Sequence, residues 1–208
     1  MWRKTRSNGT CKGADANRNF GFHFRDGGSS TNPCSDTYSG SVAFSEAETA
    51  AVRDFITSIS KDLVAYISLH SYSQYILLPF GHNNRRIPQY DAYMNLGRRI
   101  AQATAARFGT QFTPGNIVDL LYVASGGSMD WVKGIHNVNL TLTYEMRDQG
   151  RYGFILPDTQ IVPSSQEFLD GIAVAVAELR TGIVTPDLPP DTFQFAPQRP
   201  AYKPSIVP

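Results

Sequence analysis

The sequence predicts an α/β layered fold, in which helices cover a sheet. Segments with strand character alternate with segments of helical periodicity along most of the chain, a pattern typical of such folds. The 208 residues suffice for one domain with a sizeable core, and 41% of them are hydrophobic, as in ordinary globular proteins.

The first predicted helix begins at Ser45. Residues 1–44 are rich in Gly and Asn and show no helical period, so we expect loops with short extended pieces there. Ser45-Glu46-Ala47-Glu48 has the pattern of a capping box. Apolar residues then follow at helical spacing, namely Ala51, Val52, Phe55, Ile56 and Ile59.

Two strands are expected next. Residues 62–70, DLVAYISLH, are short, apolar and β-prone, which predicts a buried strand ending at His70. Residues 76–80, ILLPF, predict a second strand near a sheet edge, because Pro79 cannot donate to a ladder.

A long helix is expected over residues 89–108, with Gly109 as its stop. Residues 139–145, NLTLTYE, alternate in polarity and predict a strand. One face of that strand would carry Leu140, Leu142 and Tyr144, and the other Thr141, Thr143 and Glu145.

The last predicted helix spans residues 164–180, with a capping box at Ser164-Ser165-Gln166-Glu167 and a stop at Gly182. The composition then changes, since seven of the 13 prolines lie in residues 184–208. We therefore expect one domain over residues 1–183 and a proline-rich tail, disordered or loosely draped, over residues 184–208.

Charge and hydropathy exclude several functions. The net charge of +1 gives no electrostatic basis for binding nucleic acid or an anionic membrane, and no apolar run is long enough to span a bilayer. The N-terminal residues MWRKTRSNGTCKG lack the apolar region of a signal peptide.

Two cysteines and two glycosylation motifs bear on the compartment. Cys11 and Cys34 bracket a loop rich in Gly, Ser and Asn, and from the residues alone they are either a disulfide or two unrelated thiols. A disulfide there would stabilise the fold by roughly 3 kcal/mol on the chain-entropy model. The sequons Asn8-Gly9-Thr10 and Asn139-Leu140-Thr141 fit a secreted chain but also arise by chance.

Several polar residues lie where chemistry is common. His70 ends a strand, a position that suits a metal ligand, a base or a satisfied structural residue. Glu145 also ends a strand, where a buried carboxylate needs a function or a partner such as Arg147. Arg18 lies in a loop of hydrogen-bonding residues, and either grips a carboxylate or is solvated. Tyr122 precedes a Gly-rich segment, residues 124–128, that predicts a flexible hinge.

Five motifs together resemble one family. They are WRKTRS at 2–7, DANRNF at 15–20, SLHSYSQ at 68–74, YVASGGSMDW at 122–131 and TYEMRDQGRYGFILP at 143–157. In order and spacing they resemble the zinc metallocarboxypeptidases of the pancreatic A/B (M14) family, carboxypeptidase A in particular, over about residues 1–181. The resemblance implies the C-terminal part of a mixed-sheet α/β/α sandwich.

The resemblance also implies roles for individual residues. His70 matches a zinc ligand, Glu145 the general base, and Arg3 the arginine that stabilises the oxyanion. The groups that match the binding site for the substrate's terminal carboxylate and the next subsite are Asn17, Arg18, Tyr122 and Tyr72. Cys11 and Cys34 match the family's disulfide, which favours a secreted, extracellular protein, and we expect a monomer that acts on peptide or protein C-termini.

Specificity is partly readable from the same motifs. In the resembled family the residue before Asp-Trp lies at the floor of the side-chain pocket, and an acid there selects basic residues. Here that residue is Met129, and the matching wall residues carry no charge: Gly81, Leu121, Ala124 and Thr143. We therefore expect removal of apolar or aromatic C-terminal residues.

One departure affects the metal. The family takes its other two zinc ligands from an upstream His-x-x-Glu motif, and none of the four histidines here has Glu three residues later. His23-Phe24-Arg25-Asp26 is the nearest approach, but it lies in a loop and is not expected to substitute. We expect an N-terminally truncated domain with an incomplete site for its single Zn²⁺. The alternatives are a module that binds peptide C-termini without cleaving them and an inert product that does not fold alone.

Overall fold

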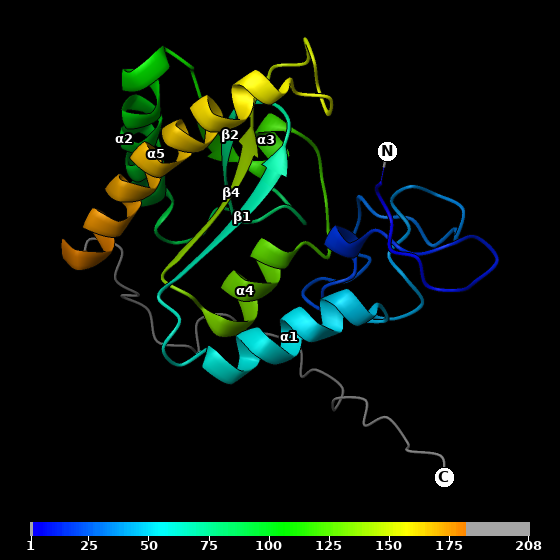
Figure 1. Ribbon diagram of the computed structural model, residues 1–208. Helices are drawn as coiled ribbons and strands as arrows, with labels where there is room; N and C mark the ends of the chain where they lie inside the picture. The colour runs from blue at the N-terminus through cyan, green and yellow to red at the C-terminus, as the bar shows by residue number, and fades with distance from the viewer. Residues whose placement is uncertain (1, 182–208) are drawn as a thin grey trace.

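A four-stranded mixed sheet forms the centre of the molecule (Figure 1). The computed structural model describes residues 2–181, so the predicted tail and the predicted stop at Gly182 lie outside the described residues. The strands lie in the order β1 (Ala65–Ser71), β4 (Leu140–Met146), β2 (Tyr75–Leu78), β3 (Thr113–Asn116). β1 runs parallel to β4 and β2 parallel to β3, whereas β2 and β4 are antiparallel.

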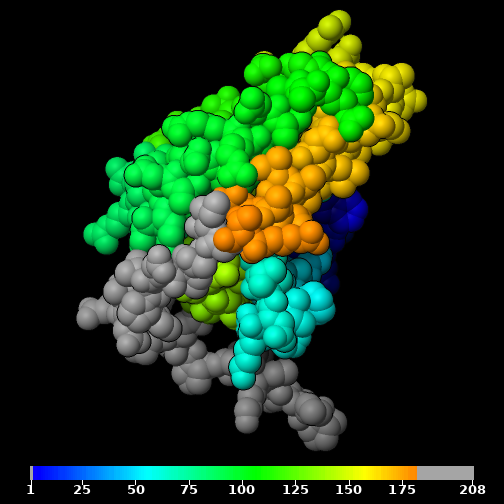
Figure 2. All heavy atoms as spheres, turned by 90° about the vertical axis from the view of Figure 1, so that its left-hand side faces the viewer, coloured from blue at the N-terminus to red at the C-terminus, as the bar shows by residue number. Residues whose placement is uncertain are grey.

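Helices cover both faces of this sheet, which gives the predicted α/β/α arrangement. α2 (Tyr90–Phe108) and α5 (Ile161–Thr181) lie side by side on one face (Figures 1 and 2). α4 (Ser128–His136) lies on the other, with α1 (Ala47–Ile59) beyond it (Figure 1). Within residues 2–181, no helix is both long and apolar enough to cross a bilayer.

The two faces of β4 are used as its alternation predicts. Leu140, Leu142 and Tyr144 are almost fully buried, and the Tyr144 ring packs edge-on against Phe168 of α5, with ring centroids 5.1 Å apart. The opposite face meets α4, where the Thr143 hydroxyl lies 3.5 Å from the Met129 sulfur.

Two predictions about strand position are wrong. The strand predicted to be buried, β1, has one neighbour among the described residues and is half-buried, with Leu69 56% exposed. β2, predicted near an edge, pairs on both sides. Pro79 follows the last residue of β2, so its missing N–H interrupts no ladder bond.

Both predicted capping boxes are also wrong. Glu46 is the N-cap of α1 and makes no capping bond through its side chain, and the Ser45 hydroxyl donates to Glu46 and accepts from Asn19. α5 begins at Ile161, directly after a 3-10 turn at Asp158–Gln160, so the predicted cap, Ser164, lies inside the helix. The predicted end of α2 is correct, since Gly109 adopts φ 77° and its N–H donates to the Ala105 carbonyl.

Besides two 3-10 turns, at Ala16–Arg18 and Asp158–Gln160, three short elements were not predicted: β3, α3 (Ile117–Leu120) and α4. α4 starts inside the segment predicted as a flexible hinge, at Ser128. Its residues 128–134 are all buried, so α4 has no exposed polar face to produce an amphipathic period.

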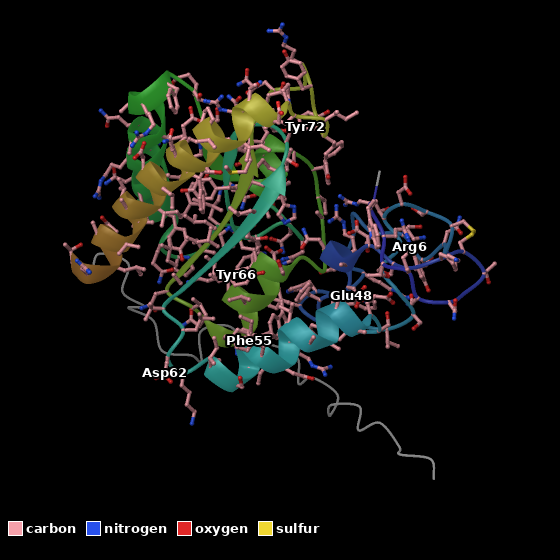
Figure 3. The ribbon with its side chains drawn as sticks, viewed as in Figure 1. Arg6, Glu48, Phe55, Asp62, Tyr66 and Tyr72 are labelled. Carbon is pink, nitrogen blue, oxygen red and sulfur yellow. A yellow bond between two sulfur atoms is a disulfide. The ribbon has the colours of Figure 1, made fainter. Side chains whose placement is uncertain are left out.

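The N-terminal loops form a layer beside the helices and sheet. Cys11 and Cys34 are joined in a disulfide there, as the resemblance implied (Figure 3). The fully buried amide of Asn19 donates to the carbonyls of Ser39 and Val42, which fastens these loops to the start of α1.

Candidate active site

One pocket of about 250 Å³ lies at the carboxyl ends of β1 and β4. Every predicted catalytic, metal-binding and substrate-binding residue lines it: Arg3, Asn17, Arg18, His70, Tyr72, Tyr122, Met129 and Glu145. Predicted wall residues Leu121, Ala124 and Thr143 line it as well. Gly81, the fourth predicted wall residue, does not line the pocket, although its carbonyl accepts from the Ala124 N–H at 2.7 Å.

Arg18 is a buried cation without an anionic partner among residues 2–181. The residue is 3% exposed, and its guanidinium donates to the carbonyls of Gly28 (3.1 Å) and Asn17 (2.9 Å). Its guanidinium carbon also lies 5.9 Å from the centre of the Tyr122 ring. This burial rules out the solvated-arginine alternative, and a buried unpaired guanidinium favours an anionic ligand.

The turn that carries Arg18 is held against the start of α4. Asp15 accepts from the Asn17 N–H at 3.0 Å, and the Asn17 side-chain oxygen accepts from the Ser128 N–H at 3.0 Å. Gly126 packs so closely that an added Cβ would lie 2.4 Å from the Arg18 carbonyl oxygen, and its φ is +73°. Only glycine suits this position.

The predicted hinge at residues 124–128 is therefore corrected. Ser125 is fully buried, its N–H donates to the Gly27 carbonyl, and the Gly126 carbonyl accepts from the Phe20 N–H. Tyr122, by contrast, is 56% exposed at the edge of the pocket.

Arg3 is oriented by a buried carboxylate. Its Nε and Nη2 lie 3.1 and 2.5 Å from one oxygen of Asp15, a residue that is 2% exposed. The Arg3 side chain remains 46% exposed, so its guanidinium borders the pocket while Asp15 holds it. Asp15 thus holds both Arg3 and the backbone of Asn17.

Glu145 and His70 are register partners on β4 and β1. Burial raises the pKa of the Glu145 carboxyl to about 7, and Arg3 partly opposes that rise. A carboxyl with such a pKa is suited to accept and return a proton near neutral pH. Burial, and then the positive charges of Arg3 and Arg18, lower the pKa of His70, which favours a neutral imidazole.

The structural alternative for Glu145, pairing with Arg147, is wrong. Arg147 points to α5 and pairs with Glu167, with its Nε 2.8 Å from a carboxylate oxygen. Arg147 thus braces the end of β4 by ion pairing, whereas Asp148 accepts N–H bonds from the turn at residues 150–153.

Asp130 and Phe154 are among the lining residues that the sequence did not single out. One oxygen of Asp130 accepts from the N–H groups of Gly81 (2.8 Å) and His82 (3.2 Å), and the other is buried without a partner in the described part of the chain. Phe154 is 57% exposed and packs edge-on against Tyr72, with ring centroids 4.9 Å apart. Figure 3 places Tyr72 beyond the end of β1. Asp130 and Phe154 lie within two of the five motifs of the sequence analysis, and this position was the only sign in the sequence that they belong to the site.

The described residues do not fit a complete catalytic zinc site. Such a site takes three protein ligands and a water. Among residues 2–181, no three His, Cys, Asp or Glu side chains come together in a way that could hold a metal. His70 lies 3.0 Å from the Ser68 hydroxyl, and His23 pairs with Asp26 while stacking on His82.

Comparisons with known proteins place this chain among the metallopeptidases. The chain belongs to the zinc carboxypeptidase family, whose model matches residues 1–171. It is 42% identical over 184 residues to a zinc carboxypeptidase of Simulium vittatum, which covers 86% of this chain and 60% of that protein. It is 41% identical to human carboxypeptidase A1, over 80% of this chain and 40% of that protein.

Solved structures agree with this assignment. Bovine thrombin-activatable fibrinolysis inhibitor, solved in complex with tick carboxypeptidase inhibitor, superposes with a TM-score of 0.85 at 36% identity, covering 88% of this chain and 63% of that one. Carboxypeptidase A from Helicoverpa armigera superposes with a TM-score of 0.77 at 31% identity, covering 86% of this chain and 46% of that one. The chain thus spans less than two thirds of these relatives.

Proposed function

We propose that the pocket receives the last residue of a peptide or protein chain. Arg18 is the observation that carries this proposal, because a buried guanidinium with no anionic partner in residues 2–181 matches a terminal carboxylate in charge and shape. Asn17 lies beside it, with its side-chain oxygen accepting from Ser128 and its NH₂ donating to no group in the described part of the chain.

The substituents of that last residue would meet different walls. Met129 and Leu121 offer apolar contact, so we propose a preference for apolar or aromatic C-terminal side chains. Tyr122 covers the bound end from the exposed side, and Tyr72 with Phe154 contacts the preceding residue.

The reaction proposed for the complete domain is hydrolysis of the last peptide bond. Glu145 would accept a proton from the attacking water and return it to the leaving amine, and Arg3 would stabilise the oxyanion. Zinc ligation beyond His70 would come from outside residues 2–181, since these residues do not fit a three-ligand site. The disulfide supports the further proposal that the peptidase is secreted, and we also propose that it acts as a monomer.

Release of C-terminal residues tests this reaction. In a protein that carries this segment and a complete zinc site, Glu145→Gln should lower kcat by at least about 100-fold, the scale of general acid–base catalysis, and barely change KM. Unchanged release of C-terminal Phe would contradict the assignment of the base.

A second candidate, binding without cleavage, is favoured by the lack of a three-ligand group among the described residues. Incubation of the 208-residue chain with zinc and a peptide ending in Phe separates the candidates. Free Phe supports hydrolysis by this chain, whereas saturable binding with an intact peptide supports the module.

A further inference from the structure

The N-terminal loop carries a glycosylation sequon that the pocket does not use. Asn8, Gly9 and Thr10 are all exposed and lie outside helices and strands. The side chains of Asn8 and Thr10 make no hydrogen bond to residues 2–181, so the amide and the hydroxyl are both available. An Asn-x-Thr motif can be modified when it is exposed in a surface loop, as it is here.

The second sequon has the opposite environment. Asn139 leads directly into β4, and its carbonyl accepts from the buried hydroxyl of Tyr93. Leu140 and Thr141 are fully buried, between the neighbouring strands β1 and β2. The Thr141 hydroxyl that a transferase must recognise is therefore inaccessible once β4 has formed.

The surroundings of Asn8 indicate the compartment in which transfer takes place. Cys11, three residues further along, forms a disulfide with Cys34. Disulfides form and persist in the secretory pathway, where N-glycans are also attached. Asn8 and this disulfide thus lie in the same loop layer, and the secretory pathway is where both the disulfide and an N-glycan would form.

We propose that Asn8 is N-glycosylated and that Asn139 is not. The amide nitrogen of Asn8 forms a bond to the anomeric carbon of an oligosaccharide carried on a polyprenyl diphosphate. The bond from that carbon to the diphosphate breaks, the lipid diphosphate leaves, and the amide nitrogen loses one proton. No oxidant or reductant is needed.

A glycan at Asn8 would leave the pocket open. Arg3 is the part of this segment that lines the pocket, and Asn8 does not line it. In Figure 3, Arg6 lies on the loop layer, well away from Tyr72 at the pocket. Asn8 itself is exposed, as are Gly9 and Thr10 beside it.

Expression of the full 208-residue chain behind a secretion signal in insect cells tests the proposal. Intact mass and peptide mapping are measured on secreted and cell-associated protein, before and after peptide:N-glycosidase, which converts a glycosylated Asn to Asp. We expect one glycan, lost in both Asn8→Gln and Thr10→Ala and retained in Asn139→Gln.

An unmodified Asn8 in both fractions, or a glycan whose loss follows Asn139→Gln, would overturn the proposal. The cell-associated fraction keeps the test decisive if the chain folds poorly, because transfer precedes secretion. The proposal rests on the secretory compartment that the proposed function also assumes, but not on peptide recognition. Binding of a peptide ending in Phe should be the same for Asn8→Gln and the parent chain, so the two proposals can fail separately.

Discussion

Lys133 is a buried cation that titrates within an accessible pH range. Its Nζ donates to the Val138 carbonyl at 3.0 Å, and the residue is 5% exposed. Burial lowers its pKa from 10.5 to about 8. The unfolded chain therefore binds more protons than the folded one between about pH 8 and pH 10.5, and stability rises with pH across this window.

We expect Lys133 to contribute an increase of up to about 3 kcal/mol in the free energy of unfolding between pH 7 and pH 10. Denaturant unfolding of the parent chain and Lys133→Met across this range measures the difference. As pH rises, the free energy of unfolding of the parent chain should increase relative to that of Lys133→Met. A difference between the two proteins that does not change with pH would contradict the burial of the ammonium group.

Met129 decides the charge of the pocket floor in our account. Met129→Asp should favour a peptide ending in Lys over one ending in Phe by at least about tenfold relative to the parent chain, or about 1.4 kcal/mol. Dissociation constants for the two peptides measure the change. Met129→Asn is the neutral control, and an equal shift in both variants would show that charge is not the cause.

At the scale of elements, the start of α1 anchors the segment that carries Arg3. Glu46 is 4% exposed and accepts from the hydroxyls of Thr5, Ser7 (2.6 Å) and Ser45 (2.8 Å). Burial opposes ionisation, but these donors outweigh it and lower the pKa of Glu46. Its stabilising effect is therefore present above the unfolded pKa and is lost as pH falls through the lower folded value.

Glu46→Gln should lower the free energy of unfolding at pH 7 by about 1–3 kcal/mol, since charge-assisted bonds are lost. Thermal unfolding at pH 7 and pH 3 measures this, and the deficit should shrink at pH 3. Glu48→Gln is the matched control, because Glu48 is exposed in the same helical turn. Equal losses in the two variants would refute the anchoring role.

Strong periodic elements were predictable, and their ends and partners were not. α2 with its Gly109 stop, and the two faces of β4, follow from local pattern. The side chains of the predicted caps are engaged by distant segments, Ser45 by Asn19 and Glu167 by Arg147. α4 is buried nearly all round, so its sequence lacks the period by which a surface helix is found.

The site was predictable as a set of residues but not as a geometry. Motif matching identified the eight predicted residues that line the pocket. The anchoring of Arg3 and Asn17 by Asp15, the close packing of Gly126 on Arg18, and the position of Asp130 all depend on tertiary contacts. No local pattern in the sequence specifies them.

For the whole molecule, the disulfide constrains the loop layer that supplies Arg3 and Arg18. Cys11 and Cys34 are separated by 23 residues, and closing such a loop stabilises by roughly 3 kcal/mol on the chain-entropy model. The Cys11→Ala/Cys34→Ala variant should lose about that much in denaturant unfolding. Reduction of the parent chain should cost a similar amount, and an unchanged midpoint in both experiments would contradict this estimate.

Recognition of a free C-terminus by Arg18 is the central claim, and one calorimetric comparison tests it most directly. The 208-residue chain is titrated with an acetylated peptide ending in Phe, as the free acid and as the amide, and so is Arg18→Gln. Arg25→Gln serves as a control outside the pocket. The account predicts that the parent and the control bind the acid at least about tenfold more tightly than the amide, and that Arg18→Gln abolishes this difference. Equal binding of acid and amide by the parent chain, or a preference that survives in Arg18→Gln, would contradict it.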